Sequence, residues 1–98
     1  MEEKIKAIDL IHYLLGKTIS SVRINDDVYA NDKYSIVIKG EEYATFVEII
    51  LDDDLYPHGV RRIALYEALG ISIENNIISF RVRSWSGIGP DDRIVFTV

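Results

Sequence analysis

The segment that most constrains the fold of this chain is 43–51, YATFVEIIL, which is long enough for a full β-strand and apolar at nearly every position. Successive side chains of a strand point to opposite faces, so both faces of this segment are apolar and only Glu48 opposes burial. We therefore expect a central strand with a neighbour along each edge and cover on both faces. Helices can cover one face of the sheet, and a partner subunit is the candidate for the other.

The rest of the chain predicts two similar halves, each with a helix followed by three strands. Apolar residues at helical spacing indicate the helices, while alternating patterns and turn-forming residues indicate the strands. The expected helices are 2–15 and 60–69, and the expected strands are 17–24, 34–39, 43–51, 71–74, 77–84 and 93–98. Together they predict a single α+β domain over residues 1–98, with an antiparallel sheet of five or six strands and two helices in the order αβββ-αβββ.

The expected second helix, 60–69, is followed by Gly70, a residue that commonly ends helices. Arg61 and Arg62 would lie in its first turn, where the helix dipole disfavours positive charge. The three aspartates at 52–54 offer compensation, and they also end the central strand because they repel one another and have low strand propensity. On this balance the segment is predicted to be helical.

Composition limits the chemistry and the setting of the protein. The absence of cysteine excludes disulfides and thiolate catalysis and is typical of a reducing compartment. Charged residues interrupt the apolar positions of 1–17, so we expect no signal peptide, and no other apolar run is long enough to cross a bilayer. We expect a cytoplasmic protein that does not act at a membrane.

The strongest candidate binding site lies on one face of the strand 77–84. Alternation places polar and charged side chains on this face and the apolar side chains of residues 78, 80 and 82 on the other. The candidate binding residues are Ser79, Arg81, Arg83 and Trp85, with Arg23 from the strand 17–24. Paired arginines beside a tryptophan can clamp an anion, stack on a nucleic-acid base or anchor a protein interface.

A structural interpretation of the same arginines stays open. Arg81 and Arg83 would then form ion pairs across the sheet with Glu48 or with the aspartates at 52–54, and Trp85 would pack on the rim of the core. A cluster that also includes Arg23 would favour nucleic-acid binding, whereas an even scatter of arginines would favour protein contact.

A second candidate site is the strand-to-helix turn at which the expected second helix begins. It holds Tyr56, His58, Arg61 and Arg62, and a histidine in such a turn can serve as a general base. No nucleophile motif, phosphate loop or pair of carboxylates accompanies it, so we predict that the protein is not an enzyme. The aspartates at 52–54 and His58 match no metal-binding spacing, so we expect no metal and no cofactor.

These observations predict a small acidic protein, with a formal net charge of −5, that binds or regulates a protein partner without catalysis. We expect a homodimer, because two helices shield little more than one face of the sheet and leave Ile77, Val95 and Trp85 on the other. The alternative is a sheet that curls until its own far strands cover this face, as in a small barrel, which would give a monomer. Two alternatives remain: a nucleic-acid-binding protein that uses the arginine and tryptophan face, and a small-ligand enzyme that uses the loop 56–62. The acidic balance counts against extended contact with a duplex.

Overall fold

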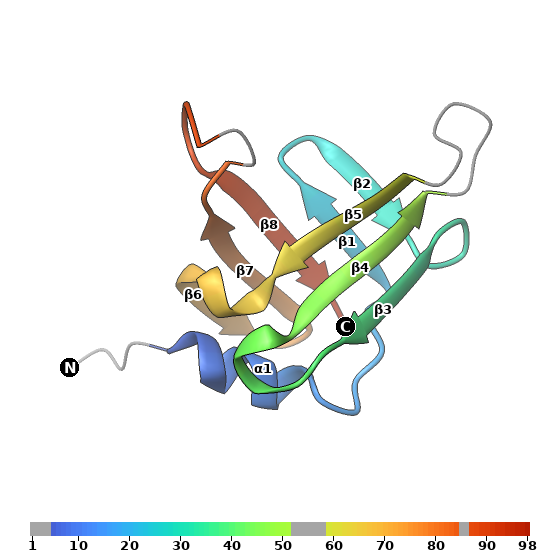
Figure 1. The fold of residues 1–98 in the computed structure, drawn as a ribbon. Coiled ribbons are helices and arrows are strands. Elements are labelled where there is room, and N and C mark those ends of the chain that lie inside the picture. The colour runs from blue at the N-terminus through green and yellow to red at the C-terminus, as the bar shows by residue number, and fades with distance from the viewer. Residues whose placement is uncertain (1–4, 52–58, 85–86) are drawn as a thin grey trace.

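The computed structural model describes residues 5–51, 59–84 and 87–98. Within these ranges it contains one α-helix, eight strands and two short 3₁₀ helices (Figure 1). The elements are α1 (Ala7–Leu14), β1 (Ser21–Ile24), β2 (Asp27–Ala30), β3 (Ser35–Lys39), η1 (Glu42–Ala44), β4 (Phe46–Leu51), β5 (Gly59–Ala64), η2 (Leu65–Glu67), β6 (Leu69–Glu74), β7 (Ile77–Val82) and β8 (Asp92–Thr97).

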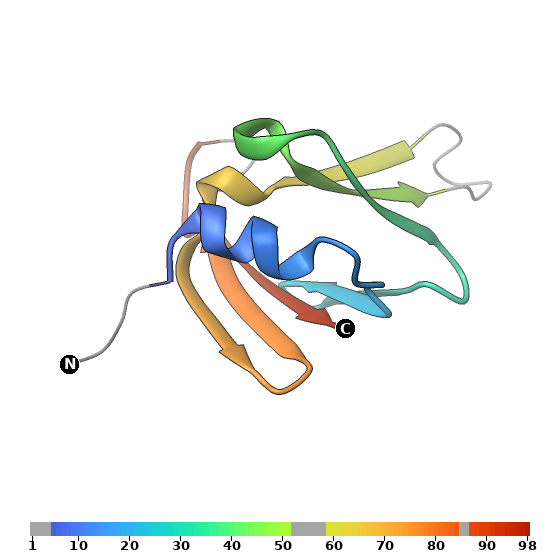
Figure 2. The ribbon, with the colours of Figure 1, turned by 90° about the horizontal axis from the view of Figure 1, so that it is seen from below.

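Two antiparallel sheets stacked face to face make up most of the protein. The first has the order β2-β1-β8-β7-β6 and the second the order β3-β4-β5. Helix α1 contacts η1, η2 and β6, and Figure 2 shows it lying across one opening between the sheets. The fold is therefore α+β, but the expectation of one five- or six-stranded sheet with two helices is wrong. The described residues form eight strands in two sheets and only one α-helix.

In place of the expected helix 60–69 the chain forms strand β5, then η2 and the start of β6. Strand β5 pairs with β4, with Val47 opposite Ile63 and Glu48 opposite Arg62. This pairing satisfies the backbone N–H and C=O groups along the second edge of β4, which a helix would leave without partners. It also removes two arginines from the unfavourable first turn of a helix.

Helix α1 is shorter than the expected helix 2–15, whose residues 2–4 lie outside the described ranges. Of the apolar stripe expected from helical spacing, Ile11 and Leu14 are buried, whereas Leu15 is 59% exposed. Leu10, Ile11 and Leu14 are at most 2% exposed, at the spacing that places them on one side of a helix. The backbone N–H of Lys6 donates to Asp9 Oδ2 at 3.1 Å, which satisfies a donor at the start of the helix. The apolar face of α1 thus closes the end of the core that the two sheets leave open.

The core lies between the two sheets and confirms the predicted alternation of the strand 77–84. Ile78, Phe80 and Val82 of β7 are buried, and the rings of Phe80 and Phe96 meet edge to face at 5.2 Å between centroids. The predicted turn between β6 and β7 is also present, with Asn75 at a φ of +53°. The opposite side chains of β7 therefore face outward.

The central segment has two strand neighbours, as predicted, but its strand begins at Phe46. Residues Glu42–Ala44 form the 3₁₀ helix η1, and Tyr43 is 67% exposed. Val47 and Ile49 are fully buried against the five-stranded sheet. One face of β4 is thus covered by other strands of the same chain, as the alternative to the homodimer expected, although these strands form a second sheet and not one curled sheet.

Candidate functional site

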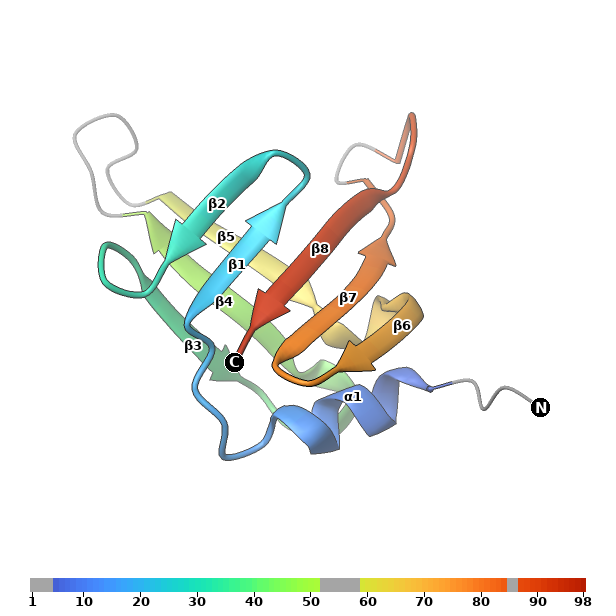
Figure 3. The same ribbon diagram turned by 180° about the vertical axis from the view of Figure 1, so that it is seen from behind.

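The outward face of the five-stranded sheet carries four polar residues of the candidate site: Arg23, Ser79, Arg81 and Arg93. The register places Arg23 of β1 opposite Val95 of β8, and Val95 opposite Ser79 of β7. In the next row Arg81 of β7 lies directly opposite Arg93 of β8. Figure 3 looks onto this face, and none of the described elements lies over it. Three arginines from three adjacent strands therefore share one open surface.

These side chains surround an open depression of about 690 Å³, which we call the arginine depression. Its polar lining comes from β1, the β1–β2 turn, β7 and β8. The polar residues are Arg23, Asn25, Asp26, Ser79, Arg81 and Arg93. Three guanidinium groups against one carboxylate make the depression positive in a protein whose formal net charge is −5.

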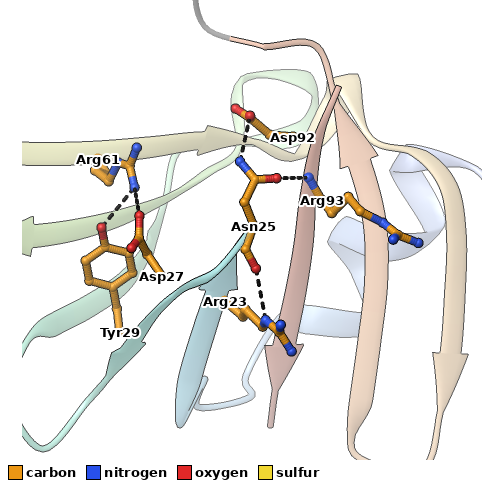
Figure 4. A network of polar contacts seen from close by, with 7 residues as sticks. All are labelled: Arg23, Asn25, Asp27, Tyr29, Arg61, Asp92 and Arg93. Carbon is orange, nitrogen blue, oxygen red and sulfur yellow. Dashed lines mark hydrogen bonds and ion pairs between the residues drawn. The ribbon is translucent and has the colours of Figure 1, made fainter. Parts of the chain in front are cut away.

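Asn25 holds the β1 end of the arginine depression in place (Figure 4). Its side-chain amide donates to Asp92 Oδ1 at 3.0 Å, and its Oδ1 accepts from the backbone N–H of Arg93 at 3.0 Å. Its backbone oxygen accepts from Arg23 Nε at 2.9 Å. Figure 4 shows the side chains of Arg23 and Arg93 extending the same way, toward the β7–β6 side of the sheet. The turn therefore orients Arg23 and occupies the Asp92 carboxylate.

Gly70 shapes the opposite side of the arginine depression. It lies in β6 with a φ of +60°, where the register between β6 and β7 is irregular. A Cβ at this position would lie 3.4 Å from Arg81 Nη2, so the Arg81 guanidinium rests against the bare glycine backbone. Glycine thus serves two purposes here, because it tolerates positive φ and leaves space for the arginine.

Within the described residues, Arg23, Arg81 and Arg93 have no carboxylate oxygen within 4.0 Å. The ion pairs found there join other cations to Glu48 and Asp27. Like charges at directly opposite positions of an antiparallel pair destabilise a sheet, so the opposed arginines cost stability in the free protein. An anion held between the guanidinium groups would offset this repulsion.

The ion pair expected between Arg81 or Arg83 and Glu48 does not form. Glu48 is 6% exposed on the outer side of β4, where its carboxylate lies 3.1 Å from Lys39 Nζ and accepts from Arg62 Nε at 3.1 Å. The Lys39 hydrogen bond, followed by the Arg62 hydrogen bond, holds the pKa of Glu48 below its ordinary value. The structural interpretation of the arginine face is wrong for Glu48, and the aspartates at 52–54 lie outside the described residues.

The structure gathers only part of the predicted site. Arg83 is exposed, follows the last residue of β7 and does not line the arginine depression. Trp85 lies outside the described residues. Arg93 is a member that the sequence interpretation missed, although its alternation with Ile94 gave it an outward position. Its role depends on the register that sets it opposite Arg81.

Only two of the four residues of the second candidate site lie within the described ranges. Tyr56 and His58 lie outside the described residues. Arg61 and Arg62 are neighbours in β5, so they point to opposite faces of the three-stranded sheet. Arg61 donates to the hydroxyl of Tyr29 at 2.9 Å across the gap between the sheets, whereas Arg62 bonds to Glu48 on the outside. These two arginines cannot converge on one ligand.

No cluster of three or more potential metal ligands occurs among the described residues. No helix in the described ranges is long and apolar enough to cross a membrane. The chain has no match among protein-family models, curated proteins or solved structures. The case for a function therefore rests on the geometry and charge of the arginine depression.

Proposed function

We propose that this chain is a non-catalytic binding protein that holds a single nucleic-acid strand by its phosphates on the outward face of the five-stranded sheet. The observation that carries the proposal is the grouping of Arg23, Arg81 and Arg93 around one depression with no described carboxylate paired to them. A guanidinium presents a planar fork of donors that matches two phosphate oxygens at once, which makes arginine the preferred phosphate ligand.

The distribution of charge favours a single strand over a duplex. Duplex binding neutralises many phosphates and needs a broad basic surface. Here the positive charge is confined to the arginine depression, and Asp26 lines one side of it. Glu74 occupies the same outward face farther along β6, since it pairs with Ile77. A flexible strand can place one to three phosphates on the arginines and direct the rest of its length away from these carboxylates.

The test is the salt dependence of binding to a short labelled oligonucleotide, measured by fluorescence anisotropy. If the strand contacts two or three phosphates, the affinity should fall about 7- to 18-fold between about 50 and 200 mM salt, because each phosphate neutralised on a single strand contributes about −0.7 to the logarithmic slope. The double variant Arg81→Ala/Arg93→Ala should remove binding.

The matched control is Lys33→Ala, which deletes an exposed cation in the β2–β3 connection, away from the arginine depression. It should leave the affinity nearly unchanged. Loss of affinity in Lys33→Ala equal to that in Arg93→Ala would indicate general charge attraction instead of a site. Absence of any strand binding at low salt would refute the proposal.

Protein contact, with self-association as its form, is a second candidate supported by a different surface. The outward face of the three-stranded sheet is apolar around Glu48: Val37, Phe46 and Ile50 are half-buried and Val60 is 41% exposed. A second copy of the chain could cover this face through a two-fold contact. Light scattering tests it, since a mass near 11.2 kDa at micromolar concentration contradicts the homodimer, and Val60→Glu should dissociate a dimer that uses this face.

A further inference from the structure

The arginine depression has a charge that suits one kind of phosphate better than another. Its lining holds three arginines and one aspartate, which leaves two positive charges. An internal phosphodiester of a nucleic-acid strand carries one negative charge, whereas a terminal phosphate monoester carries about −1.5 to −2 near neutral pH. The monoester therefore matches the charge of the depression, and the diester leaves part of it uncompensated.

The surroundings of the depression also disfavour a strand that passes through it. A phosphate in the middle of a strand has a charged neighbour on each side, so the strand must leave the depression in two directions. Asp26 stands on the β1–β2 side and Glu74 lies farther along β6 on the same face. Each carboxylate repels a neighbouring phosphate within about 8 Å at physiological ionic strength. A terminal phosphate has one neighbour and needs only one exit.

The lining of the depression supplies several hydrogen-bond donors for an oxyanion. Arg81 and Arg93 occupy directly opposite backbone positions, and both line the depression. The Arg23 guanidinium uses Nε for the Asn25 carbonyl, which leaves its two terminal amino groups for a ligand. The Ser79 hydroxyl lies on the same lining. A monoester has three terminal oxygens to share among these donors, whereas a diester has two.

We propose that the arginine depression is a site for the terminal phosphate of a nucleic-acid strand, so that the protein binds phosphorylated strand ends in preference to strand interiors. This inference rests on the proposed function, because it specifies which phosphate of the strand occupies the site. It assigns direct phosphate contacts to Arg23, Arg81 and Arg93 and a discriminating role to Asp26, whose charge repels the phosphates of a continuous strand.

The experiment compares one oligonucleotide sequence in three forms: with a 5′-phosphate, with a 3′-phosphate, and with hydroxyl groups at both ends. One phosphorylated form should bind about tenfold more tightly than the hydroxyl form, the effect expected of an added charge-assisted contact. Arg93→Lys keeps the charge but loses the fork, so it should reduce this preference. Asp26→Asn should strengthen binding of the hydroxyl form more than that of the phosphorylated form.

The outcomes separate the inference from the function on which it rests. Equal affinity for all three forms, with binding still lost in Arg81→Ala/Arg93→Ala, would overturn the preference for strand ends and leave strand binding standing. No binding of any form would refute both. A phosphoserine peptide that displaces the phosphorylated strand at equal concentration would overturn the nucleic-acid source of the monoester. Thermal unfolding of each variant verifies that a lost affinity is not a lost fold.

Discussion

The directly opposed arginines should make the site a source of instability, and this can be measured without knowing the ligand. Arg81 and Arg93 occupy facing positions on adjacent strands and have no described ion-pair partner. Two charges roughly 5 to 8 Å apart in water-like surroundings repel by about 0.5 to 0.8 kcal/mol. We therefore expect the repulsion to lower the stability of the free protein by about 0.5 kcal/mol at low ionic strength, within the range seen for facing side chains.

A double-mutant cycle isolates this repulsion from other effects of the substitutions. Arg81→Thr and Arg93→Thr each remove the repulsion, so their stability changes both contain it, whereas the double variant contains it once. When each change is counted as a gain in the free energy of unfolding, the sum of the two single gains should exceed the gain of the double variant by about 0.5 kcal/mol. The cycle cancels the intrinsic strand propensity of threonine and the packing lost with each arginine stem.

Urea unfolding at low salt provides the assay, with thermal unfolding as a second measurement. For a domain of this size about 0.5 kcal/mol corresponds to about 2 to 4 °C in Tm. At about 1 M salt the screening length falls to about 3 Å and the coupling should vanish. A coupling of zero at low salt, or one showing that the arginines stabilise each other, would refute the argument that the two guanidinium groups repel each other without a compensating carboxylate nearby.

Three further predictions test the surroundings of the site and the fold. Gly70→Ala should lower stability by about 1 kcal/mol or more in urea unfolding, because alanine resists a positive φ and its Cβ meets the Arg81 guanidinium; an unchanged midpoint would contradict this role. Glu48→Gln should be less stable than the parent at neutral pH, and the difference should shrink on acidification. The lowered pKa of Glu48 contributes stability above the unfolded-state pKa that is lost as the pH falls through the folded-state pKa, so parallel stability curves for the two proteins would exclude it. Leu10→Ala should cost about 2 to 5 kcal/mol, whereas Leu15→Ala, at a residue 59% exposed, should cost far less; equal losses would mean that α1 does not pack as described.

Local patterns in the sequence were sufficient wherever the periodicity had one interpretation. The strand 77–84 alternates without interruption, so the inward side chains of β7 and the outward positions of Ser79 and Arg81 followed from the pattern alone. The helical spacing correctly placed Ile11 and Leu14 in the core, but it also included Leu15, which is 59% exposed, and it left out Leu10, which is fully buried. Such patterns determine which side of an element faces the core, because they depend only on the geometry of a single strand or helix.

Patterns failed where one segment fits two periods. Residues 59–64 place apolar side chains at positions compatible with a helix or a strand, and Gly70 favoured the helix. The open edge of β4 decided the matter, because its backbone groups gain partners only if this segment pairs as β5. Strand β2 was missed because Asn25, Asp26 and Asp27 were interpreted as a turn that leads into a polar loop, whereas the chain reverses at this turn and then pairs with β1.

The arginine depression was predictable from the sequence only in part, because its residues followed from the sequence pattern but their grouping depended on the tertiary structure. The alternation within each strand determined that Arg23 and Arg81 lie on the side opposite the buried residues. Alternation contains no information about which strands are neighbours. The strand order and register brought β1, β8 and β7 side by side and set Arg93 opposite Arg81. The physical reason is that an outward position is a property of one strand, whereas a site is a property of the hydrogen-bonded pairing between strands far apart in the chain.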